Sequence, residues 1–306
     1  MVEMLQGAAG APLDRRSLLK GVALAGLGVA ATRCASGGAP PAVVGTHPAA
    51  AATAEDTVQM IFTAALIAED LATTFYYHGL LGEVIQDHRL AGAEGSALTV
   101  STLGSAGNVG YLRAALAEEI SHADLMRQLI GRADAAADPV QTFYFPEGSF
   151  EDLATFLSTL DALENAFVGA YLAAVRQFST MAARLAVPAA NAADIAVQRD
   201  PRGAAYTSGQ LIYFAEVSAA ILGIEAEHRA LGRVIGLSIP ANDRCYQQTA
   251  GIRTVYNGAN SAVAALAPFV KPGAKGFGAE GYSLRASRAG AARLTLPCAG
   301  GLPAAS

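Results

Sequence analysis

Two stretches of the sequence decide its fold: LAEEISHADLM at residues 116–126 and IEAEHRALG at residues 224–232. Each contains the motif Glu-x-x-His, and apolar residues flank each motif at helical spacing. In an α-helix, residues three positions apart project from one face about one turn apart. Each motif therefore places a carboxylate and an imidazole in the middle of a stripe that would pack into a protein core. The residues are Glu119, His122, Glu225 and His228.

Two further glutamates lie in the same way on two other predicted helices. Glu69 and Glu164 each stand alone in the centre of an apolar stripe. Alternation typical of strands is scarce before residue 250, so the fold class is all-α, a four-helix bundle with long connections. We expect the third helix to begin at Ser149, followed by Asp152 as an incomplete capping box. The four helices are predicted at residues 56–89, 108–130, 149–184 and 204–237.

Composition limits the classes of protein to which this chain can belong. Of its 306 residues 52% are hydrophobic and 15% are charged, which excludes an intrinsically disordered chain. The net charge of −5 argues against a nucleic-acid binder, which would carry clustered basic residues. We therefore expect no nucleic-acid partner.

The four buried glutamates need partners, because an unpaired carboxylate in a core is costly. In a bundle they would converge with the two histidines on the axis, which is the ligand set of a carboxylate-bridged pair of metal ions. Oxygen and imidazole ligands suit iron or manganese, and the absence of thiolates argues against a structural zinc. The sequence predicts two Fe or Mn ions per chain. The alternative is a vestigial bundle in which carboxylates and imidazoles pair without metal.

With these motifs in place, the sequence resembles the ferritin-like superfamily, and within it the ferritin-like domains of desiccation-related proteins. The likeness covers about residues 55–237, with all six expected ligand positions occupied in order. The resemblance implies a ferritin-like four-helix bundle. It also implies terminal ligands at Glu69 and Glu164, bridging ligands at Glu119 and Glu225, and one nitrogen ligand per metal from His122 and His228.

Three residues near the motifs are candidates for supporting roles. Asp161 lies one turn before Glu164 and would either orient a ligand imidazole or be an ordinary surface aspartate. Tyr76 and Tyr171 each follow a glutamate by seven residues, on the same face. They are either redox or hydrogen-bonding neighbours of the site or ordinary core tyrosines.

Other polar residues on these helices are interpreted as surface groups. His78 and His88 lie at the far end of the first helix among polar residues. Glu118, Asp124 and Glu227 flank the motifs but fall off the apolar stripe, so we expect them to be solvated.

The first 44 residues are interpreted as a leader. Arg15 and Arg16 precede a short apolar run at residues 21–31, in the order of a secretory signal. The run is shorter than the about 20 apolar residues that span a bilayer. The paired arginines resemble the twin-arginine export signal, which implies the translocase as a transient partner and a periplasmic or extracellular location. Arg33 before Cys34 fits a lipoprotein signal poorly, so we expect no lipid anchor there.

Two further segments, residues 45–54 and 238–306, flank the predicted bundle in the mature chain. Residues 45–54 are predicted to be a flexible arm, and no transmembrane span is expected after the leader. The tail at residues 238–306 is rich in proline and glycine, and we expect it to wrap the bundle as mostly irregular chain with one short helix near residues 261–267. Cys245 and Cys298 are candidates for a disulfide in an exported protein, with two unrelated thiols as the alternative.

Three functions are compatible with these expectations. The first is oxidoreductase chemistry, in which O₂ or peroxide reacts at the two metal ions during oxidative or drying stress. The second is a non-enzymatic stress- or desiccation-related bundle with a structural or vestigial metal site. The third, iron storage, fits the long connections and tail poorly. The sequence does not identify the catalytic residues.

Overall fold

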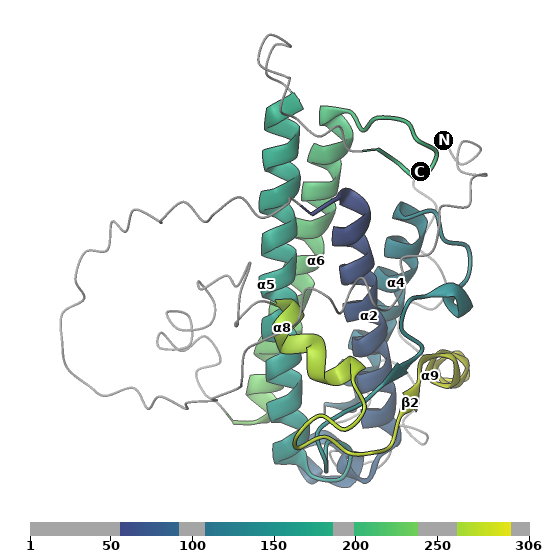
Figure 1. Ribbon diagram of the computed structural model, residues 1–306. Coiled ribbons are helices and arrows are strands. Elements are labelled where there is room, and N and C mark those ends of the chain that lie inside the picture. Colours follow the sequence, from purple (N-terminus) through teal and green to yellow (C-terminus); the bar gives the residue numbers. More distant parts are fainter. Residues whose placement is uncertain (1–55, 92–107, 186–198, 238–261, 295–306) are drawn as a thin grey trace, which may run out of the picture.

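The computed structural model describes residues 56–91, 108–185, 199–237 and 262–294, and it confirms an all-α fold built on four long helices (Figure 1). Helix α2 packs most closely against α4, and α5 against α6. The seam between α4 and α6 is packed much more loosely than either of these two pairs. The four helices are α2 (Val58–Leu81), α4 (Val109–Leu129), α5 (Leu153–Leu185) and α6 (Ser208–Ile235).

The first helix is shorter than the sequence predicts. It ends at Leu81, and a 3₁₀ helix (Glu83–Gln86) and the short helix α3 (His88–Ala91) follow. Gly82 stands at the break in an extended conformation, where a Cβ would collide with the carbonyl oxygen of Phe150. The close approach of another segment of backbone therefore fixes the end of α2. Helical periodicity continues past this point, so the sequence pattern did not reveal the break.

The third and fourth helices begin about four residues later than predicted. Asp152, and not Ser149, caps α5, because its Oδ2 accepts a hydrogen bond from the Thr155 amide at 2.8 Å. The Ser149 hydroxyl instead donates to the carbonyl of the preceding turn. Helix α6 begins with a complete capping box in which Thr207 and Gln210 bond reciprocally. Thr207 and Gln210 have the residue types and spacing of this motif in the sequence, and Thr207 lies three residues after the predicted start of the fourth helix at residue 204.

The core of the bundle divides into two apolar clusters along the helix axes. One gathers around the rings of Phe75 and Phe156, which stack 4.8 Å apart. The other gathers around Phe62 and Phe178, whose ring centroids are 5.0 Å apart. Glu119 of α4 and Glu225 of α6 lie between the segments that contribute to the two clusters. Glu69 of α2 and Glu164 of α5 lie in the part of the first cluster's segment that is nearest in sequence to the second. The site is thus enclosed by apolar packing from above and below.

The described part of the C-terminal segment packs onto the outside of the bundle. Helix α8 (Ala262–Leu266), where a short helix was predicted, lies across α5, and a 3₁₀ helix (Ala267–Val270) follows. Strand β2 (Tyr282–Ser283) pairs antiparallel with β1 (Thr142–Phe143) in the connection before α5. Helix α9 (Leu284–Ala291), which the sequence analysis did not anticipate, then packs against α2 (Figure 1).

Helix α9 corrects the interpretation of His78 as a surface group. The His78 ring lies partly buried, 4.6 Å from the Tyr282 ring centroid, and its Nε2 is 3.2 Å from the Ser287 hydroxyl. Burial lowers the pKa of His78 to about 4. The side chain of His88 lies outside the described residues. The tail, not the sequence around His78, determines the environment of this residue.

Protonation of His78 should make the folded state pH-dependent. Unfolded chains protonate histidine near pH 6.5, whereas the folded chain does so only near pH 4, so between these values the unfolded state binds more protons. The free energy of unfolding should therefore decrease as the pH falls through this window, by about 1–2 kcal/mol after allowing for solvent screening. Urea unfolding of the wild type and His78→Gln at pH 7 and pH 4.5 measures this. The loss should be smaller in the variant, and an equal loss in both proteins would contradict the prediction.

Several predictions fall outside the described residues. These concern the leader, the arm at residues 45–54 and the three cysteines, Cys34, Cys245 and Cys298. Within the described chain, α2 and α6 are long and apolar enough to cross a membrane by length and composition alone. Such evidence is weak, because a core helix of a soluble protein passes the same test, and 72% of the apolar window of α2 is buried. The expectation of no membrane span stays a prediction.

Candidate metal centre

The four long helices bring all six predicted ligand residues together at the centre of the bundle. They form two groups of four, and in each group the nitrogen and oxygen atoms lie within 4.8 Å of one another. Glu119 of α4 and Glu225 of α6 belong to both groups. All of the residues in these groups are buried or nearly so. The groups are Glu69, Glu119, His122 and Glu225, and Glu119, Glu164, Glu225 and His228.

The two shared glutamates offer one oxygen to each group. In the first, Nδ1 of His122 lies 3.4 Å from Glu225 Oε1 and 3.8 Å from Glu119 Oε2. In the second, Nδ1 of His228 lies 3.6 Å from Glu225 Oε2 and 3.0 Å from Glu119 Oε1. The opposite oxygens of each carboxylate thus face opposite groups. Each of these carboxylates could therefore offer one oxygen to an ion in each group. Glu69 belongs only to the first group and Glu164 only to the second, and we call these two the outer glutamates.

The cluster contains many buried polar atoms that lack a hydrogen-bond partner among the described residues. They include both oxygens of Glu119, both oxygens of Glu225 and Nδ1 of both histidines. Oε2 of Glu69 and Oε2 of Glu164 are also without a partner. Buried polar groups in proteins are normally satisfied, and a group of exceptions at one place requires an explanation. These atoms all belong to the two groups, so metal ions there would satisfy them.

The electrostatics of the cluster agree with this reading. Burial, and then repulsion from Glu69, raises the pKa of Glu119. Burial and repulsion from Glu225 raise the pKa of Glu164 well above its usual range. Without a cation these two carboxyl groups therefore resist ionisation. Divalent ions would reverse this, because positive charge stabilises the ionised form.

Two tyrosines hold the outer glutamates. The Tyr76 hydroxyl donates to Glu164 Oε1 at 2.6 Å, and the Tyr171 hydroxyl donates to Glu69 Oε1. Burial raises the pKa of both tyrosines well above the usual range, so both remain donors. A third tyrosine, Tyr111, was not predicted from the sequence: its hydroxyl lies 3.3 Å from that of Tyr76 and donates to the backbone carbonyl of His228 at 2.8 Å. Only the packing of α4 against α2 and α6 reveals its role.

The polar neighbours of the motifs differ from their predicted roles in part. Asp161 accepts a hydrogen bond from the amide of Asn165 at 3.2 Å. Glu118 was expected to be a solvated residue, but its Oε2 lies 2.8 Å from Nε2 of His228. Glu118 on α4 therefore contacts the outer nitrogen of the His228 imidazole. Glu227 lies exposed, as expected.

A second buried charge cluster lies beside the site. Arg127 of α4 contacts Asp70 at 2.5 Å, Asp138 at 2.6 Å and Asp124 at 2.6 Å. Asp124, also expected to be solvated, is half exposed and pairs in addition with Arg288 of α9 at 2.7 Å. Burial raises the pKa of Asp70 to about 8, against the opposing effect of Arg127. Asp70 follows Glu69 directly in α2, so this cluster holds the helix segment that carries one outer glutamate.

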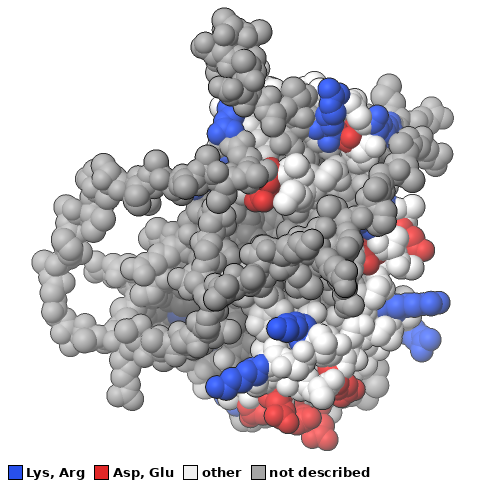
Figure 2. Space-filling model, viewed as in Figure 1, with Lys and Arg blue, Asp and Glu red and all other residues white. Residues whose placement is uncertain are grey.

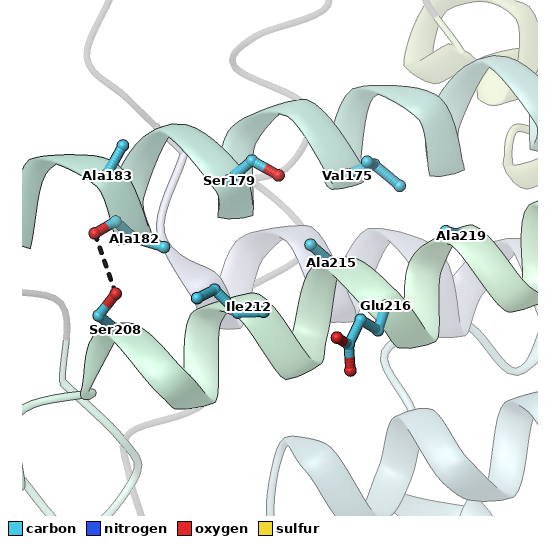
Figure 3. A pocket seen from close by; sticks show the side chains of 9 residues that line it. All are labelled: Val175, Ser179, Ala182, Ala183, Ser208, Ile212, Ala215, Glu216 and Ala219. Carbon is cyan, nitrogen blue, oxygen red and sulfur yellow. Dashed lines mark hydrogen bonds between the residues drawn. The ribbon is translucent and has the colours of Figure 1, made fainter.

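The surface offers a further hollow away from this cluster. A groove of about 520 Å³ lies between α5 and α6, and all of its lining residues lie before Glu225 in α6 or after Glu164 in α5 (Figure 3). Small and apolar side chains line most of it, with Glu216 and two serines as the polar members. It shares no residue with the two groups. On the face seen in Figure 2, basic side chains are dispersed rather than gathered.

The fold and the site together define a helical bundle with a buried cluster of glutamate and histidine that could hold metal ions. Residues 57–196 match the model of the ferritin-like domain family, which supports the ferritin-like superfamily for this bundle. The match covers α2, α4 and α5, whereas α6 and its ligand candidates lie beyond it. Searches among curated proteins and among solved structures find no match.

Proposed function

We propose that this chain is an exported ferritin-like protein that holds two iron or manganese ions, at which O₂ or peroxide reacts during oxidative or drying stress. The observation that carries the proposal is the pair of groups joined by Glu119 and Glu225, with their buried atoms left without partners. Iron and manganese both accept oxygen and imidazole ligands. The ligand roles of the six residues belong to this proposal, as does the desiccation-related subtype.

The metal ions, when bound, would supply the change of oxidation state and polarise the oxygen species. The protein residues would hold the ions in place and limit the access of water. Glu119 and Glu225 would hold the two ions at a fixed separation, and Glu69 and Glu164 would each complete one position. Tyr76 and Tyr171 donate to these outer carboxylates and would hold them in place. The two apolar clusters on either side would limit the access of water.

The experiment is metal analysis of protein purified from its native compartment, followed by assays of O₂ and peroxide consumption. We expect about two Fe or Mn ions per chain and consumption that depends on them. Two ions without consumption would favour the alternative of a structural metal in a stress-related bundle. No metal in carefully prepared protein, with no uptake of Fe(II) or Mn(II), would contradict the proposal in both forms.

The proposed location rests on the leader. Changing Arg15 and Arg16 to lysine should leave the precursor in the cytoplasm, because the paired arginines form the address that the translocase reads. Cell fractionation and immunoblotting of wild type and variant measure the distribution. Changing Lys20 to arginine is a matched control and should leave export unchanged. Normal export of the double variant would show that residues 1–44 have been misinterpreted.

A further inference from the structure

The two halves of the candidate metal centre differ outside the ligands themselves. His228 is held on its outer nitrogen by Glu118, with Nε2 and Oε2 2.8 Å apart. For His122 the three carboxylates in reach all face Nδ1, and no carboxylate of the described chain approaches its Nε2. The six ligand residues are nearly symmetric between α4 and α6, and this contact breaks the symmetry.

The sequence carries the same asymmetry. Glu118 directly precedes Glu119 in α4, and the corresponding position before Glu225 in α6 is Ile224. Isoleucine cannot accept a hydrogen bond from an imidazole. Only one of the two Glu-x-x-His motifs is therefore preceded by a carboxylate.

Two tyrosines add to the support on the same side. The ring centroid of Tyr76 lies 5.7 Å from that of His228, and that of Tyr111 lies 6.2 Å away. Tyr111 also bonds the backbone carbonyl of His228. The side chain of His228 is 2% exposed and that of His122 is 12% exposed. His228 is thus fixed through its ring, its outer nitrogen and its backbone.

We propose that Glu118 is a positioning residue that makes the two metal positions inequivalent, with the ion at His228 bound more tightly than the ion at His122. This inference rests on the proposed metal site and deepens it. A carboxylate on the outer nitrogen fixes the tautomer, so that Nδ1 is left without a proton and faces the metal. It also raises the basicity of the ligand, and loss of such a partner typically costs 10–100-fold in metal affinity.

A role in fold stability alone does not account for Glu118. Its side chain is 45% exposed, and an ion pair with one partner so exposed contributes little to folding. The same exposure places a carboxylate at the boundary between solvent and the buried cluster, on the loosely packed seam between α4 and α6. Through Glu118, a partly exposed carboxylate contacts His228, and it makes no such contact with His122.

The test is a Mn(II) titration of the full mature chain, followed by electron paramagnetic resonance of the free ion. Wild type should bind two ions with different affinities. Glu118→Ala should weaken one of them by about 10–100-fold and leave the other unchanged. Glu118→Gln, which retains an acceptor oxygen without the charge, should have a smaller effect. Glu227→Gln is the matched control for lost charge, because Glu227 lies exposed on α6.

A double-mutant cycle assigns the weakened position. Glu118→Ala should have its full effect in a His122→Ala background and no effect in a His228→Ala background. Circular dichroism checks that each variant is folded. Nitrogen-15 spectra of the metal-free protein provide a separate readout, since the proton on Nε2 of His228 should be lost from its fixed position in Glu118→Ala.

The outcomes separate this inference from the proposed function. If wild type binds two ions and Glu118→Ala binds them with unchanged affinities, the positioning role is wrong and the metal site stands. An equal effect in both histidine backgrounds would overturn the assignment to His228. If wild type binds no metal, both proposals fail together.

Discussion

Replacing Glu119 and Glu225 together with alanine should abolish the binding of both metal ions, because each of these residues belongs to both groups. In wild type, each ion that binds only the folded state should raise the free energy of unfolding by about 2.7 kcal/mol when free metal is 100 times the Kd of that ion. The double variant should show no such increase. Thermal unfolding with and without Mn(II), together with metal analysis after gel filtration, measures both effects.

The metal-free variant should be at least as stable as metal-free wild type. Burial and mutual repulsion already oppose ionisation at Glu119, so its removal relieves an unfavourable arrangement even though it leaves a cavity. A matched control is Glu216→Ala with Glu227→Ala, which removes two carboxylates that lie exposed on α6. The control should retain both ions. Full metal uptake by Glu119→Ala with Glu225→Ala would show that the ions bind elsewhere.

Replacing Arg127 with methionine should cost about 3–5 kcal/mol of folding free energy, the second large effect expected. The guanidinium contacts three aspartates, and two of them, Asp70 and Asp138, are nearly fully buried. Without it, these two buried carboxyl groups would lose their cationic partner. Urea unfolding at pH 7, followed by circular dichroism, measures the loss.

Two further variants show whether the loss arises from unpaired charge. Arg285→Met changes an exposed arginine on α9 and should shift stability by less than about 0.5 kcal/mol. Adding Asp138→Asn to Arg127→Met should recover part of the loss. The second substitution replaces a carboxyl group that has lost its partner, the Arg127 guanidinium. If Arg127→Met unfolds at the same urea concentration as Arg285→Met, the cluster does not stabilise the bundle.

The fold and the convergence of the six candidate ligands could be predicted from sequence because both follow from local periodicity. The spacing of Glu119 to His122 and of Glu225 to His228 places each pair on one helix face, and the apolar stripe turns that face inward. Their ligand roles stay predictions until metal is measured. What spacing cannot supply is the register between helices, which determines the neighbour of each side chain.

The residues that the sequence analysis missed or misplaced depend on that register. Glu118 falls off the stripe of α4, yet it reaches His228 because α6 packs beside it. His78 is covered by α9, more than two hundred positions away in the chain. Gly82 ends α2 because another segment passes close to it. In each case a segment that is distant in sequence determines the environment of the residue, and the pattern within one helix does not identify that segment.

The docking of α9 on α2 also bears on the order in which the chain folds. The contacts of Ser287 with His78 and of Arg288 with Asp124 join residues 209 and 164 positions apart. Helix pairs joined by shorter connections close first, since the entropy lost on closing a loop grows with its length. Gly290 packs so closely against the Tyr77 hydroxyl of α2 that a Cβ there would collide with it. During synthesis, the bundle would therefore have an interval in which its candidate ligand residues are assembled and α9 has not yet docked.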